Sequence, residues 1–147
     1  MTGSGPVVVD ASAVADAVLR PDGVGDEVRN LLGTSQCHAP HLIDAELGSI
    51  LRRLVLRSEL EPGVASQRLV HAQRLVDVRH ELVGPLTSMA WRLREDVTFY
   101  DGLYVALAIG LGQPLVTSDA KLASTAGRYC EVILLGRGMA EPEILPP

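Results

Sequence analysis

The 147-residue sequence has few aromatic residues, few cysteines and no excess of positive charge, and each shortage narrows the class of protein. Aromatic residues make up 3% of the chain, so the core must be built from Leu, Val, Ile and Ala, and base-stacking surfaces have little raw material. The net charge is −5, from 13 basic and 18 acidic residues. Proteins that bind nucleic acid by phosphate neutralisation alone are usually basic. Either nucleic acid is not the partner, or a bound cation changes the local sign of the charge.

The two cysteines, Cys37 and Cys130, are too few and too far apart for a disulfide framework or a thiolate zinc site. We expect both to be buried free thiols in a reducing environment. No apolar run approaches the ~18 residues that a membrane span needs. The opening MTGSGP lacks the basic-then-apolar order of a signal peptide. These absences predict a cytoplasmic protein that does not interact with a membrane.

Short apolar segments alternate with amphipathic segments along the chain, and 47% of the residues are hydrophobic. We expect strands at 6–10, 36–41, 80–84, 113–119 and 130–136, helices at 11–20, 22–33, 42–60, 62–78, 86–95, 100–112 and 120–127, and an irregular tail at 136–147. Strands separated by helices pair in parallel through right-handed crossovers. The sequence therefore predicts a single domain over residues 1–147, of class α/β, with a central parallel sheet.

Four carboxylates lie where apolar side chains would be less costly. Asp10 ends the strand-like run VVV and Asp119 ends PLVTS, and ligands of such sheets bind beyond the carboxyl ends of strands. Glu46 borders the apolar stripe of its helix, and Asp101 begins the most apolar helix of the chain. Each acid alone has an ordinary explanation, as a helix cap or as the partner of an arginine.

A shared site for a hard divalent cation explains all four acids together. Mg²⁺ and Mn²⁺ prefer oxygen ligands, so a few carboxylates without His or Cys suit them. Carboxylates packed together raise one another's pKa unless a cation lies among them. The spacing of the four acids has no rigid local pattern, so this interpretation depends on the fold bringing them together.

Four segments carry a resemblance to a known family: VVVDASA, APHLIDAELGSILRR, TFYDGLYVALA and PLVTSDAKLA, in this order. They resemble the PIN-domain nucleases, and most of all the VapC toxins of bacterial toxin–antitoxin pairs. The resemblance covers residues 6–135 and implies a three-layer α/β/α sandwich. It also implies an endoribonuclease that depends on Mg²⁺ or Mn²⁺ and leaves 5′-phosphate and 3′-hydroxyl ends on tRNA or rRNA.

The resemblance implies a set of site residues. The catalytic and metal-binding acids would be Asp10, Glu46, Asp101 and Asp119, supported by the hydroxyls of Ser12 and Thr117. Some relatives carry a further acid just beyond the fourth, where this chain has Ala120 and Lys121, so one or two metal ions remain open. Arg52 and Arg53 are candidates for contact with RNA or a partner. The expected partners are a VapB-type antitoxin and a second copy of the chain.

Other functions remain as alternatives. His38, His41, His71 and His80 show no ligand spacing, although a His pair would allow ribonuclease chemistry without metal. A receiver domain usually has paired acids after its first strand, and a phosphatase of the haloacid-dehalogenase type needs an acid where Ser12 stands. A PIN-like scaffold that binds without cutting is the main non-enzymatic alternative. Trp91 is expected in the core.

Overall fold

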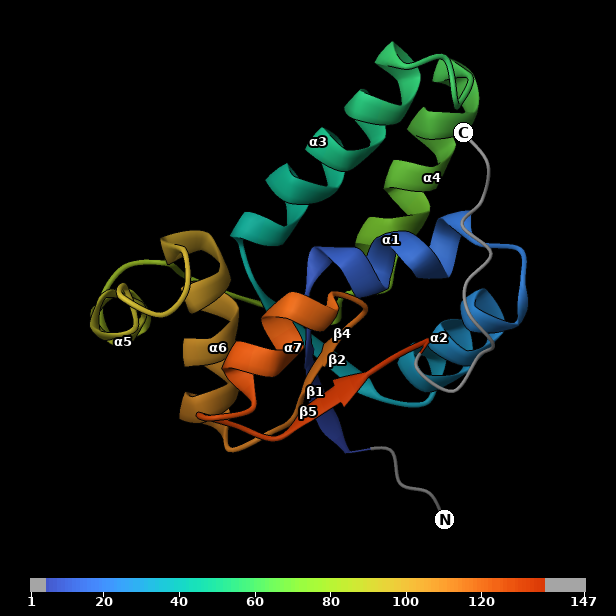
Figure 1. Cartoon of the computed structure of the whole chain (residues 1–147). Coiled ribbons are helices and arrows are strands. Elements are labelled where there is room, and N and C mark those ends of the chain that lie inside the picture. The colour runs from blue at the N-terminus through green and yellow to red at the C-terminus, as the bar shows by residue number, and fades with distance from the viewer. Residues whose placement is uncertain (1–4, 137–147) are drawn as a thin grey trace.

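The computed structural model describes residues 5–136 and has a five-stranded central sheet (Figure 1). The strands are β1 Pro6–Val9, β2 Gln36–Pro40, β3 Val78–His80, β4 Leu115–Thr117 and β5 Val132–Leu134. Their order is β3-β2-β1-β4-β5, and every pair is parallel. Val8 of β1 is in register with His38 on one side and Leu115 on the other. The sheet therefore has β1 at its centre, with β2 and β3 added on one side of that strand and β4 and β5 on the other.

Seven helices connect the described strands. They are α1 Ala11–Leu19, α2 Gly23–Gly33, α3 Leu42–Leu56, α4 Pro62–Arg74, α5 Pro85–Arg92, α6 Phe99–Leu111 and α7 Ala120–Ala126. Helix α6 packs on β1, β2 and β4, and α7 packs on β4 and β5. Helix α1 packs on α2, α3 and α4, and α3 and α4 form a hairpin that projects from the body (Figure 1). Right-handed crossovers place α1–α4 on one face of the sheet and α5–α7 on the other, so the predicted α/β/α sandwich is confirmed.

Several boundaries predicted from the sequence are wrong. The helix predicted to reach residue 78 ends at Arg74, and the strand predicted at 80–84 is β3 at 78–80. The bounds of β3 depend on a contact between distant segments, because the strand is defined by its pairing with β2, in which Val78 faces His38. Gly84 then takes a φ of +84°, a conformation that suits glycine, and the next helix follows at once. The predicted tail at 136–147 lies outside the described residues apart from Gly136.

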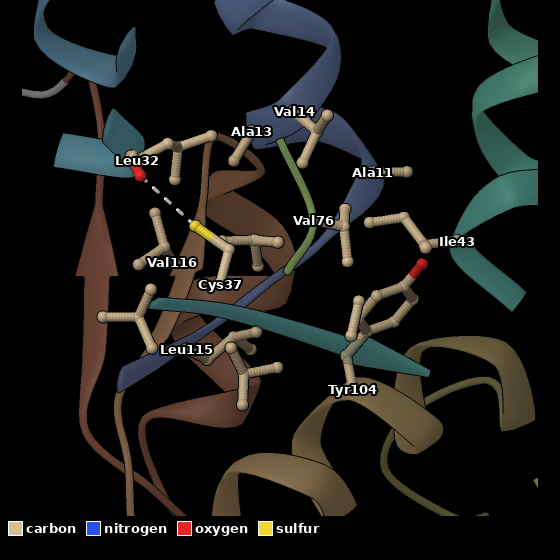
Figure 2. Packing of buried hydrophobic residues seen from close by; sticks show 14 of the residues in the cluster. Ala11, Ala13, Val14, Leu32, Cys37, Ile43, Val76, Tyr104, Leu115 and Val116 are labelled. Atoms are coloured by element: carbon tan, nitrogen blue, oxygen red, sulfur yellow. Dashed lines mark hydrogen bonds between the residues drawn. The ribbon is translucent and has the colours of Figure 1, made fainter. Parts of the chain in front are cut away.

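The core is aliphatic, as the composition predicts, with one large exception. Figure 2 shows alanines and a valine of α1 packed with Leu32 of α2, Cys37 of β2 and two residues of β4, and Tyr104 of α6 beside Ile43 of α3. Tyr104 is among the largest fully buried side chains. Trp91, which the sequence analysis assigns to the core, is instead 58% exposed. Within residues 5–136, no helix combines the length and apolar character needed to cross a membrane.

The described cysteines are free thiols. Cys37 is fully buried and donates a weak hydrogen bond from its Sγ to the Leu32 carbonyl (Figure 2). Burial raises the pKa of the Cys37 thiol to about 12, with the nearby Asp77 charge adding to the effect. Cys130 is only partly buried. The prediction of a buried thiol therefore holds fully for Cys37 and in part for Cys130.

Candidate active site

Asp10 lies at the point where the central strand β1 meets helix α1. Its Oδ1 accepts a hydrogen bond of 3.0 Å from the Ala13 backbone N–H, so it caps α1 as the ordinary explanation requires. The cap does not account for its burial, because Asp10 is only 6% exposed. Among the polar and charged residues that the structure describes, only Asp10 and Thr117 are buried. A buried carboxylate at the centre of the sheet is costly unless other groups compensate it.

Two hydroxyls hold the Asp10 carboxylate from different segments. Thr117, the last residue of β4, donates from Oγ1 to Oδ2 of Asp10 at 2.5 Å. Ser12 donates from Oγ to Oδ1 at 2.8 Å and accepts a hydrogen bond of 3.1 Å from the Ser118 backbone N–H. Thr117 Oγ1 also accepts from the Asp119 backbone N–H at 3.0 Å. The predicted supporting hydroxyls therefore tie the ends of β1 and β4 together.

Burial still dominates the protonation equilibrium of Asp10. Desolvation raises the pKa of the Asp10 carboxyl from 3.8 to about 6, against the lowering effect of the three hydrogen bonds. The charge of Asp119 raises it further. The site therefore holds a carboxylate that lacks a positive partner among the described side chains.

Glu46 reaches the site region from α3, held by a residue that the sequence analysis missed. Tyr104 donates a hydrogen bond from its hydroxyl to Glu46 Oε1 at 2.7 Å, joining α6 to α3. Burial raises the pKa of Glu46, the Tyr104 hydrogen bond lowers it, and the charge of Asp101 raises it. Burial and the same hydrogen bond raise the pKa of the Tyr104 phenol. Tyr104 thus remains a neutral donor that fixes one oxygen of Glu46.

The start of α3 is anchored by an ion pair that the sequence also did not reveal. Arg79 of β3 donates from Nε and Nη2 to the two carboxylate oxygens of Asp44, at 2.6 and 2.9 Å. It also donates to the Val76 and Gln73 carbonyls. Because Asp44 precedes Glu46 by two residues, this pair fixes the first turn of the helix that presents Glu46.

The other two predicted acids, Asp101 and Asp119, lie at the starts of α6 and α7. Asp101 lies in the first turn of α6, where its backbone N–H is capped by the Thr98 hydroxyl at 3.1 Å. Asp119 caps α7, its Oδ1 accepting from the Lys121 and Leu122 backbone N–H groups at 2.9 and 3.1 Å. Burial raises the pKa of Asp101, and the charge of Asp119 raises it further.

The four predicted acids are therefore close enough for the charge of one to shift the pKa of another. Asp119 acts on both Asp10 and Asp101, and Asp101 acts on Glu46. No group of three His, Cys, Asp or Glu side chains within residues 5–136 already stands in a ligating arrangement. The donor set nevertheless suits a hard divalent cation, since it combines neutral hydroxyls with carboxylates, and the carboxylates repel one another without a cation. The oxygen atoms of these side chains are therefore the type of ligand that such an ion prefers. To bind one ion together, the side chains would have to move closer to one another.

The remaining candidates lie apart from this cluster or are otherwise engaged. Arg52 and Arg53 are exposed on α3, about 9–10.5 Å further along the helix than Glu46 at 1.5 Å per residue. His38 does form a histidine pair, with its Nδ1 2.9 Å from His80 Nε2, a contact that no sequence pattern indicates. The other His38 nitrogen contacts Gln36 at 2.8 Å, so neither nitrogen of that ring is free for acid–base chemistry.

Comparison with known proteins identifies the class to which this fold and site belong. A family model described as the PIN domain matches residues 7–128. The chain is 44% identical over 128 residues to Ribonuclease VapC1 of Mycobacterium tuberculosis. The aligned region covers 87% of this chain and 96% of that protein. The chain therefore belongs to the PIN-domain family, and within it to the VapC proteins.

Solved structures support the same fold. The crystal structure of PAE2754 from Pyrobaculum aerophilum matches with a TM-score of 0.64 and 24% identity, over 86% of this chain and 91% of that one. A member of the VapBC family of toxin–antitoxin systems, VapBC-5 from Mycobacterium tuberculosis, matches with a TM-score of 0.57 and 20% identity, over 88% and 98%. At these identities the likeness concerns the fold alone.

Proposed function

We propose that this chain is the toxin of a toxin–antitoxin pair and an endoribonuclease that uses Mg²⁺ or Mn²⁺ to hydrolyse RNA to 5′-phosphate and 3′-hydroxyl ends. Its relative VapC1 is named a ribonuclease, and the sequences are similar along nearly their whole length. Membership of the PIN-domain family supports the same reaction class.

One observation carries the proposal: a carboxylate is buried at the carboxyl end of the central strand and has three hydrogen-bond donors but no cationic partner. Asp10 is coupled by charge to Asp119, which is coupled in turn to Asp101. A fold that only needed a helix cap would not bury the carboxylate at this cost. Binding a divalent cation offsets the repulsion and makes an acidic site receptive to a phosphodiester.

The position of each residue indicates its role in this reaction. Asp10, Asp101 and Asp119 would hold the ion, with Ser12 and Thr117 fixing the orientation of Asp10 through their hydroxyls. Glu46, with one oxygen held by Tyr104, has its other oxygen available to bind the ion or to accept a proton from the attacking water. A bound divalent ion supplies a lowered pKa for that water and stabilises charge on the phosphate.

The partners follow from the same family. A VapB-type antitoxin would cover the acid site and neutralise it, in line with the toxin–antitoxin title of the VapBC-5 structure. A homodimer, and contacts of Arg52 and Arg53 with RNA or antitoxin, belong to the same proposal. The bacterial cytoplasm, where RNA and antitoxin are found, is the proposed site of action.

One observation favours the alternative of a binding scaffold without catalysis: no three carboxylates of the described chain are already in ligating positions. Incubation of the purified protein with total bacterial RNA, followed by mapping of new ends, separates the two. The enzyme yields new 5′-phosphate ends at few sites, which disappear with EDTA and with Asp10→Asn. A scaffold yields none, and cleavage that persists in EDTA contradicts the metal role.

A further inference from the structure

The few aromatic side chains of this protein are distributed unevenly between core and surface. The chain has one Trp, three Tyr and one Phe. Tyr104 is buried, but Trp91 is 58% exposed and Tyr100 is 60% exposed. Burying an aromatic side chain removes about 150–250 Å² of surface from water, which would stabilise a core that has few other large apolar groups. Leaving Trp91 and Tyr100 on the surface forgoes that stabilisation.

Both exposed rings belong to the helix pair that carries Asp101. Helices α5 and α6 approach so closely that a Cβ added at Gly102 would lie 3.3 Å from the Ala90 carbonyl oxygen and 3.6 Å from its Cβ. Trp91 directly follows Ala90, and Tyr100 directly precedes Asp101. The crossing of the two helices thus places the backbone of both aromatic residues close to Asp101.

An arginine lies over the Trp91 ring. The Arg94 guanidinium carbon lies 5.0 Å from the centroid of the Trp91 ring, and Arg94 Nη1 donates to the Trp91 carbonyl at 3.0 Å. Arg92, the last residue of α5, is also exposed. An aromatic ring with an arginine beside it is the combination that binds unpaired bases, by stacking on the ring and by attraction of the backbone to the cation.

We propose that Trp91 and Tyr100, with Arg94, form a base-stacking surface that binds unpaired nucleotides of the RNA next to the phosphate held at the acids. This inference rests on the proposed function and names how the substrate is held. RNA is recognised mainly through unpaired bases that stack on aromatic or arginine planes. The surface selects single-stranded or looped RNA over a duplex, whose bases are already stacked.

The kinetic test compares Trp91→Ala and Tyr100→Ala with Leu56→Ala, a control that removes an apolar side chain of similar exposure (65%) at the far end of α3. With a 12-nucleotide single-stranded RNA, each aromatic variant is expected to raise KM about tenfold and to leave kcat within threefold, because stacking is lost without change to the acids. Trp91→Phe should retain most of the affinity. KM values equal to that of Leu56→Ala would overturn the inference.

A second measurement does not depend on cleavage. Trp91 is the only tryptophan, so its fluorescence reports directly on this surface. In the Asp10→Asn background, the 12-nucleotide RNA should quench that fluorescence, whereas polyphosphate of the same charge should not. Equal quenching by both, or none by RNA, would overturn the inference. Intact RNA in the wild-type assay would refute the nuclease proposal alone, and weaker antitoxin binding with unchanged RNA binding would assign the surface to the protein partner.

Discussion

Replacing Asp10 with Asn should stabilise the metal-free protein above pH 6. The pKa of Asp10 is raised from 3.8 to about 6, so between these values the folded state binds more protons than the unfolded chain. Stability therefore falls as pH rises through this window, and the full cost, about 3 kcal/mol for two pKa units, is present above the folded pKa. Asparagine keeps the shape and an acceptor for the Ala13 N–H but removes the charge.

The expected gain for Asp10→Asn at pH 8 in EDTA is about 1–3 kcal/mol, after allowing for weaker hydrogen bonds from Ser12 and Thr117. For a chain of this size that corresponds to a rise in Tm of roughly 3–9 °C. Urea unfolding in EDTA at pH 8 and at pH 4 measures it, and the gain should largely vanish at pH 4. The exposed Asp26→Asn is the matched control, with a change within about 0.5 kcal/mol. A variant less stable than wild type at pH 8 would refute the reasoning.

Other predictions follow from single contacts. Thr117→Val removes a hydrogen bond to a buried carboxylate and should lower the free energy of unfolding by about 1.5–3 kcal/mol at pH 8 in urea titrations. Tyr104→Phe frees Glu46 and should lower kcat about tenfold with little change in KM, whereas a matching change in KM would argue against a positioning role. Gly25→Ala puts a Cβ 1.9 Å from the Arg20 carbonyl oxygen and should cost about 3 kcal/mol or more by thermal unfolding. Cys37 should resist a thiol reagent in the native state and react after unfolding.

The parts of the site that can be predicted from the sequence are those marked by a local pattern of apolar and acidic residues. Asp10 after three valines and Asp119 after a short apolar run mark strand ends, and parallel strands bring such ends to one edge. Only the resemblance to a family indicates Ser12 and Thr117, and in the structure both donate hydrogen bonds to Asp10. The metal itself stays a prediction.

The parts that were not predictable depend on contacts between distant segments. Tyr104 reads as a core residue in an apolar helix, and nothing local shows that its hydroxyl meets Glu46, 58 positions away. The sequence predicts Trp91 in the core, but Ala90 is the residue of α5 that packs against Gly102, and Trp91 beside it is exposed. The strand β3 is fixed by pairing with β2 rather than by its own three residues.

Titration of the purified protein with Mn²⁺, followed through the electron paramagnetic resonance signal of the free ion, tests the central claim most directly. The account predicts that wild type binds Mn²⁺ at the acid site and that Asp10→Asn, although folded, binds it at least tenfold more weakly, because a buried carboxylate is removed from the ligand set. Equal binding by the two proteins, or none by wild type, would contradict it.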